Sequence, residues 1–427
     1  MKPVRITLGR AHTIAAFAMD EARRTGIPAA SLLPLGSLRR YAPDIGDVSL
    51  LAVAPRDVHA DVLRGFERLG RTGAPSQKTA TTLTAITAKG PLTIHVATPE
   101  DAGAALAWHT GSRAHTERLM ARAGRLGLRF ADGRLTRAAA PVDCPDEGAL
   151  YAALELPYIP AELREDGSEV DAAERGTLPR LVSSLDIRGD LHMHTTWSDG
   201  RDSVRRMIHA SQALGYDYIA ITDHSQRARA SRALAADDIP RQRKEIDDAR
   251  ARLGGLPVLH GIEVDIMPDG SLDFPDEVLA QFDIVLASLH DDAGHDGPRL
   301  TDRYLRAIEH PLVNVITHPA HRRPGDSPGY AVDFGRLFEA AARTGTAMEV
   351  DGAPGHLDMD GALARRAAAA GVTIAVDSDS HRYESLGQQM LFGIGTARRG
   401  WVEPSHVLNT RHLDDVRAFV ARKRGRR

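Results

Sequence analysis

The sequence has one cysteine, Cys144, in 427 residues. A single thiol excludes an intramolecular disulfide, so the core alone must hold the fold together. The chain also lacks any apolar run of 18 or more residues, and its first residues turn polar too soon for a signal peptide. We therefore expect a cytoplasmic protein with no membrane partner.

The length and composition indicate a soluble globular protein of two or three domains, with 42% hydrophobic and 26% charged residues. The net charge of −3 hides an asymmetry. Residues 1–140 hold 20 Lys and Arg against 11 Asp and Glu, a net of +9, which leaves −12 for the remainder. A basic front part suits a polyanionic partner such as nucleic acid, although a solvated Arg-rich surface would look the same.

The stretch from about 160 to 185 is polar and contains two prolines, so 161–185 is typical of a linker between a region at 1–160 and a domain at 186–427. After it, short β-rich runs alternate with helical stretches. The runs are 186–194, 216–222, 257–264, 282–289, 312–317, 346–350 and 372–376. Seven such units predict an α/β fold with a closed or nearly closed (β/α) barrel, and a doubly wound open sheet is the alternative.

The motif GDLHMHTTWSDG (189–200) places two imidazoles two residues apart, so a strand would point both to the same face. The later strands also end in His, Asp or Glu, and the C-terminal strand ends of such barrels converge on one face. The converging candidates are His192, His194, Asp199, His224, Glu263, His290, His318, Asp379 and His381.

Nine ligand-type side chains are too many for one ion and suffice for two or three, with Glu263 as a bridge. His and carboxylate sites of this kind accept Zn, Mn or Fe. Clustered divalent ions stabilise both oxygens of a phosphoryl displacement and lower the pKa of bound water. The candidate chemistry is therefore metal-assisted hydrolysis of a phosphate ester, with metal-bound water as the nucleophile and no further catalytic side chain assigned.

Residues 185–427 resemble a PHP (polymerase and histidinol phosphatase) domain. The motifs are GDLHMHTTWSDG, YIAITDHS, GIEVDIMPDGSLDFPDEVL, ASLHDD, ITHPAHR and DSDSHR. The resemblance implies a distorted (β/α)7 barrel with three divalent ions. The resemblance implies that His192, His194, Glu263 and Asp379 hold one ion. Glu263, His290 and His318 would hold the second, and Asp199, His224 and His381 the third.

The upstream part resembles the bacterial DNA polymerase X family, in which an α+β palm and thumb precede a PHP domain. LPLGSLRRYAPDIGDVSLL (33–51), AWHTGSRAHTERL (107–119) and LYAALELPYIPAELRED (150–166) carry the likeness. The palm departs from the pattern. Asp47 is kept, but Ser49 and Thr93 stand where the family has its other two carboxylates. Because polymerase metals need carboxylate ligands, we expect no polymerase activity.

The PHP part departs too, because the family's HPTGR reads HPAHR here and its EIN and RLDL read EVD and HLDM. His321 thus replaces Gly, Asp351 replaces Asn and His356 replaces Arg. Arg322 is retained and is our candidate for binding substrate phosphate, with a surface salt bridge as the alternative.

The leading hypothesis is a metal-dependent phosphodiesterase resembling the family's 3′–5′ exonuclease, which acts on DNA while a silent palm binds the strand. A phosphomonoesterase for a small metabolite, as in the histidinol phosphatase branch, is the second. The third is a catalytically idle nucleic-acid-binding protein. The intact set of nine candidates argues against the third, because an idle site would have lost ligands as the palm has.

Overall fold

The computed structural model of the chain describes residues 5–69, 77–228 and 232–425. The chain divides into Met1–Leu178, here called unit 1, and Pro179–Arg427, here called unit 2. Within the described ranges, no helix has the length and hydropathy needed to cross a bilayer.

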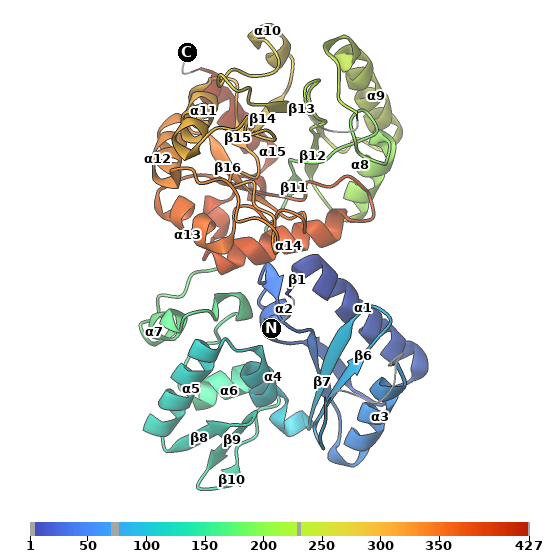
Figure 1. Ribbon diagram of the computed structural model, residues 1–427, viewed down its shortest axis with the longest axis vertical. Coiled ribbons are helices and arrows are strands. Elements are labelled where there is room, and N and C mark those ends of the chain that lie inside the picture. Colours follow the sequence, from blue (N-terminus) through green and yellow to red (C-terminus); the bar gives the residue numbers. More distant parts are fainter. Residues whose placement is uncertain (1–4, 70–76, 229–231, 426–427) are drawn as a thin grey trace. The chain divides into compact units, whose positions relative to one another are not determined.

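Unit 2 is built around seven parallel strands that follow one another in chain order (Figure 1). They are β11 (Gly189–Asp190), β12 (Tyr218–Ile221), β13 (Val258–Asp265), β14 (Ile284–Ser288), β15 (Val315–Ile316), β16 (Ala347–Asp351) and β17 (Ile374–Asp377). Every strand residue is buried, which explains the nearly continuous apolar runs of the sequence. Met193 forms a parallel bridge with Ser380, so the first and last strands meet. The predicted (β/α)7 barrel is confirmed.

Helices follow the strands and surround the sheet. They are α8 (Val204–Ala213), α9 (Ile239–Arg252), α10 (Asp276–Leu279), α11 (Gly297–Glu309), α12 (Phe334–Thr344), α13 (Gly361–Ala369), α14 (Leu386–Arg399) and α15 (Leu413–Arg424). Helix α12 shows how individual residues set the two ends of a helix. Asp333 caps its first turn by accepting a hydrogen bond from the backbone of Arg336, and Gly345 ends it in the left-handed conformation.

Helix α15 covers the end of the barrel at which the strands begin. Its side chains Val416, Phe419 and Val420 pack in one apolar cluster with Tyr218 and Ile284, the first residues of β12 and β14. The apolar side chains of α15 thus close this end of the barrel, and the nine candidate residues lie at the end where the strands finish.

Unit 1 contains a five-stranded sheet in the order β2 (Ser31–Pro34), β4 (Ser49–Val53), β7 (Pro91–Ala97), β6 (Thr82–Ile86) and β5 (Gln77–Lys78). Helices α1 (Leu8–Thr25) and α3 (His59–Leu69) contact this sheet, as does α4 (Ala102–Thr110). A second part follows in the chain. It consists of α5 (Arg113–Arg125), the antiparallel strands β8 (Leu128–Ala131), β9 (Arg134–Arg137) and β10 (Ala140–Pro141), and helices α6 (Glu147–Ala153) and α7 (Ser168–Glu174).

A buried ion-pair network ties the two parts of unit 1 together. The fully buried guanidinium of Arg164 lies 2.6 Å from Glu147 and donates two hydrogen bonds to the carbonyl of Ile159. Arg39, which follows strand β2, reaches the same carboxylate at 2.6 Å. Residues 161–178 therefore pack within unit 1, whereas 179–185 belong to unit 2.

The carboxylate of Glu147 makes the stability of unit 1 dependent on pH. Burial alone would raise the pKa of Glu147, but hydrogen bonds from Arg39 and the charge of Arg164 outweigh burial and lower it to about 2. A depressed pKa stabilises the fold above the ordinary value of about 4.3, and this contribution is lost as the pH falls toward 2.

We expect the free energy of unfolding of unit 1 to fall by about 2–3 kcal/mol between pH 5 and pH 2.5. Glu147→Gln should cost about 3–5 kcal/mol at pH 7, because it leaves a buried guanidinium without its counter-charge, and should flatten this pH dependence. Urea titration with Trp197 and Trp401 changed to Phe lets Trp108 report on unit 1. The exposed-pair variant Glu117→Gln is the control, and an unchanged pH dependence in Glu147→Gln would contradict this assignment.

Candidate metal centre

A cavity of about 490 Å³ opens where the strands of unit 2 end. Loops after the strands supply most of its walls, as barrels of this kind require. Its lining comprises Asp199, His224, Ala228, His290, His318, His321, Arg323, His356, Asp379 and His381.

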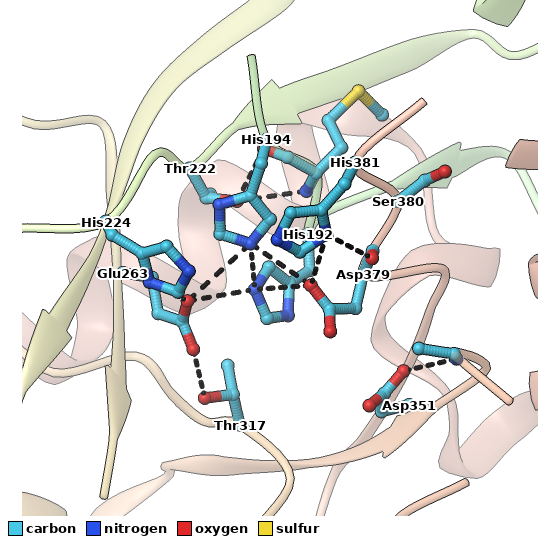
Figure 2. A network of polar contacts seen from close by, with 12 residues as sticks. His192, His194, Thr222, His224, Glu263, Thr317, Asp351, Asp379, Ser380 and His381 are labelled. Atoms are coloured by element: carbon cyan, nitrogen blue, oxygen red, sulfur yellow. Dashed lines mark hydrogen bonds and ion pairs between the residues drawn. The ribbon is translucent and has the colours of Figure 1, made fainter. Parts of the chain in front are cut away.

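Glu263, on β13, lies at the centre of this end of the barrel, with its carboxylate 1% exposed (Figure 2). Five imidazoles face it. The distances from its carboxylate oxygens are 2.8 Å to His224 Nδ1, 3.0 Å to His318 Nε2, 3.4 Å to His192 Nε2, 3.6 Å to His194 Nε2 and 3.7 Å to His290 Nε2. One buried carboxylate thus touches the ends of four other strands or their loops.

The remaining predicted residues extend the same network. The Nε2 atoms of His192 and His194 lie 3.1 Å apart, so the two rings point to the same place, as their spacing predicted. Asp379 approaches His194 at 3.1 Å. Asp199 approaches His381 at 3.2 Å and His224 at 3.6 Å. The structure therefore brings all nine candidate residues together.

Two carboxylates that the sequence analysis did not select hold the imidazoles in place. Glu349, on β16, lies 2.6 Å from Nδ1 of His192 and accepts a hydrogen bond from the backbone of His318. Asp265 lies 2.8 Å from Nδ1 of His290. A carboxylate on the far nitrogen fixes the ring and leaves Nε2 facing the centre, which is the arrangement around metal-bound histidines. The i, i+2 spacing of Glu263 and Asp265 was the available signal for the second of them.

Asp223 precedes His224 but serves a different purpose. Its buried carboxylate accepts hydrogen bonds from the backbone and hydroxyl of Thr195, from Ser198 and from the amide of Gln242. It thereby holds the loop that carries Asp199 against β12. Successive strand residues point to opposite sides, so neighbours in the sequence take separate roles.

The electrostatics of the cluster favour a divalent cation. Burial alone would raise the pKa of Glu263, but His224 and His192 hold it well below its usual range. Burial and the charges of His381 and His224 lower the pKa of His194 to about 3, while in His318 the neighbouring Glu263 outweighs burial and raises it to about 9. Imidazoles of the same cluster therefore differ in pKa, because those beside a buried carboxylate hold a proton more tightly than the others.

The donor atoms themselves fit a metal. Three groups of ligand atoms lie within 4.8 Å of one another: His194, Asp199, His224 and His381; His192, His194 and Glu263; and His224, Glu263 and His290. Oε2 of Glu263 and Nδ1 of His224 are buried and make no hydrogen bond within the described ranges. Convergent ligand atoms of His and carboxylate are what a borderline divalent ion requires, and such an ion binds in competition with protons on the imidazoles.

Arg322 lies apart from this cluster. Its guanidinium pairs with Asp360 at 3.0 Å, and its backbone donates to Asp358. Of the two neighbouring arginines, Arg323 is the one that lines the cavity. The alternative of a salt bridge, left open by the sequence, describes Arg322 in this structure.

The palm positions of unit 1 carry hydroxyl side chains in place of metal-binding carboxylates. Ser49 on β4 pairs in register with Thr93 on β7, and its hydroxyl donates to Asp47. The hydroxyl of Thr93 lies 3.0 Å from that of Thr84. Two hydroxyl groups, those of Ser49 and Thr93, therefore occupy the positions where two further carboxylates would be needed to hold Mg²⁺.

Comparisons with known proteins agree with both parts. The family described as PHP domain matches residues 190–330, and the family described as DNA polymerase beta thumb matches residues 105–165. A Bacillus subtilis protein named DNA polymerase/3'-5' exonuclease PolX is 35% identical over 391 residues, which cover 91% of this chain and 68% of that protein.

Two further relatives match only part of the chain. A protein of Caldanaerobacter subterraneus named a probable phosphatase is 31% identical over 190 residues, 41% of this chain and 70% of its own. One of Shewanella oneidensis with the same description is 30% identical over 210 residues, 46% of this chain and 78% of its own. With a PHP domain, a polymerase beta thumb and an extended match to PolX, the chain belongs to the bacterial DNA polymerase X family.

Proposed function

We propose that this protein is a metal-dependent phosphoesterase that removes nucleotides from the 3′ end of DNA and does not polymerise. One observation carries the proposal. The nine ligand-type residues of unit 2 converge at one end of the barrel, whereas the palm of unit 1 has hydroxyls in place of two carboxylates. The name of the Bacillus subtilis relative, which includes 3'-5' exonuclease, supports the same activity.

We assign three divalent ions, of Mn, Zn or Fe, to the cluster. The first would be held by His192, His194, Glu263 and Asp379, the second by Glu263, His290 and His318, and the third by Asp199, His224 and His381. Such ions lower the pKa of water toward neutrality and offset the charge that develops on phosphorus oxygens. Glu263 would be shared because its two oxygens face imidazoles on different sides.

The residues of this chain prepare the site for that chemistry. Glu349 and Asp265 keep the rings of His192 and His290 turned inward, so little reorganisation is required when substrate arrives. Because apolar side chains of α15 close one end of the barrel, a substrate would reach the cluster through the cavity at the other end.

A small phosphate monoester is the second candidate substrate. The probable phosphatases match this chain over less than half its length. Nothing in the metal cluster distinguishes a diester from a monoester, so substrate choice depends on the cavity walls.

We expect Glu349→Gln to weaken metal binding by about 10–100-fold, because His192 then loses the partner that fixes its ring. Metal bound after dialysis against graded chelator, measured by plasma mass spectrometry, gives the affinity. Glu309→Gln, at an exposed ion pair, is the matched control. Equal affinities in the two variants would show that Glu349 does not support a metal ligand.

With Mn²⁺, the protein should shorten a 5′-labelled single-stranded oligonucleotide one nucleotide at a time from its 3′ end. His192→Ala should slow this more than about a hundredfold, since even the partners behind ligands cost up to that factor. His209→Ala, on the exposed face of α8, should match the unaltered protein. Release of phosphate from histidinol phosphate with no shortening of the oligonucleotide would instead favour the monoesterase.

Primer extension should be absent with all four deoxynucleotides and either Mg²⁺ or Mn²⁺. A single palm carboxylate, Asp47, has only hydroxyl neighbours where two more anionic ligands are needed. Gel analysis of a labelled primer on a gapped template, with His192→Ala to suppress degradation, measures this directly. Template-directed extension would contradict the loss of polymerase activity.

A further inference from the structure

Three polar residues of the cavity wall lie outside the proposed ligand set: His321, His356 and Arg323. Two of them are imidazoles packed beside the metal cluster. The ring of His356 stacks on that of His318, with centroids 5.3 Å apart and planes at 24°. The ring of His321 lies 6.4 Å from His318 and 6.2 Å from His356. The three rings form a continuous wall that starts at a proposed ligand and leads outward.

The outer part of this wall is held in place. His321 stacks almost parallel on Tyr330, at 4.8 Å and 9°, and the backbone of Tyr330 donates to the carbonyl of Ala320. His321 also has φ of +48°, a conformation that glycine adopts at lower cost. His321 therefore adopts a backbone conformation that is unfavourable for a residue with a side chain, which is a recurrent property of residues at binding sites.

The wall presents unused hydrogen-bonding atoms. Nδ1 of His321 and Nδ1 of His356 are buried and make no hydrogen bond within the described part of the chain. Buried polar atoms normally have partners, so two such atoms on residues that line one cavity show that the hydrogen bonds of this wall are incomplete. Arg323 adds an exposed guanidinium, whose planar array of N–H groups matches phosphate oxygens.

We propose that His321, His356 and Arg323 bind the phosphate next to the one being hydrolysed. A nucleic acid strand carries a phosphate on every nucleotide, so a strand with one phosphate at the metal cluster must place the next one nearby. A simple phosphate ester has no such group. The wall would therefore select strands over small esters. This inference rests on the proposed function, because it names the feature of the substrate that the same site recognises.

Two diesters separate this role from general phosphate binding. Oligothymidylate has a neighbouring phosphate, and bis(p-nitrophenyl) phosphate does not. Arg323→Gln should raise KM for oligothymidylate about tenfold, the usual value of one hydrogen bond to a charged group, with kcat within about twofold. KM for bis(p-nitrophenyl) phosphate should be unchanged. Arg336→Gln, at an exposed ion pair with Asp302, is the control and should leave both unchanged.

Neutralising the substrate should reproduce the effect of the variant. A methylphosphonate at the neighbouring linkage removes that charge, so it should raise KM of the unaltered protein about tenfold and add little to Arg323→Gln. His321→Gly offers a second variant that relieves the backbone. It should raise KM for oligothymidylate without lowering the free energy of unfolding.

A binding measurement keeps the two proposals separable. In EDTA, fluorescence anisotropy should show tighter binding of fluorescein-labelled oligothymidylate than of its methylphosphonate analogue, and Arg323→Gln should abolish the difference. If the unaltered protein hydrolyses neither diester, the proposed function fails, and this binding difference still decides the subsite. Equal KM effects on both diesters, or no binding difference between the two oligonucleotides, would overturn the inference.

Discussion

The structure of unit 2 depends on the burial of one carboxylate, Glu263, among five imidazoles. Such a charge is tolerated inside a protein only when opposite charge and hydrogen bonds surround it. Protonated imidazoles meet part of this requirement, since Glu263 raises the pKa of His318 to about 9, but burial and the charges of His381 and His224 lower the pKa of His194 to about 3. Divalent cations meet this requirement well, since they place positive charge beside the carboxylate and are bound by the unprotonated nitrogens of the imidazoles.

The barrel provides the rigidity that this arrangement needs. Its strands are short and wholly buried, and α15 fills the opposite end with apolar side chains. The polar residues at the strand ends are thereby held close together from elements far apart in the chain. Glu349 and Asp265 set the ring orientations, and Asp223 anchors the loop that carries Asp199.

In the part of the chain that the structure describes, the palm of unit 1 has no cluster of carboxylates that would need a cation beside it. Asp47 is retained, but it accepts a hydrogen bond from Ser49, and the hydroxyls of Thr84 and Thr93 bond to each other, so these side chains create no demand for a cation. Its strongest electrostatic feature is structural: Arg164 and Arg39 share Glu147. Within the described ranges, groups of residues that could hold a metal ion occur in unit 2 alone.

The sequence by itself determined the seven-stranded barrel and the nine residues that converge in it, because buried parallel strands leave a strong apolar pattern and each strand end adds a recognisable polar residue. Only the tertiary structure decided which neighbour does what. It assigned Glu349 and Asp265 to ring orientation, turned Arg322 to Asp360 and Arg323 to the cavity, and packed residues 161–178 into unit 1. These outcomes depend on contacts between segments far apart in the chain, and a local pattern of residue types carries no record of which partner each side chain meets.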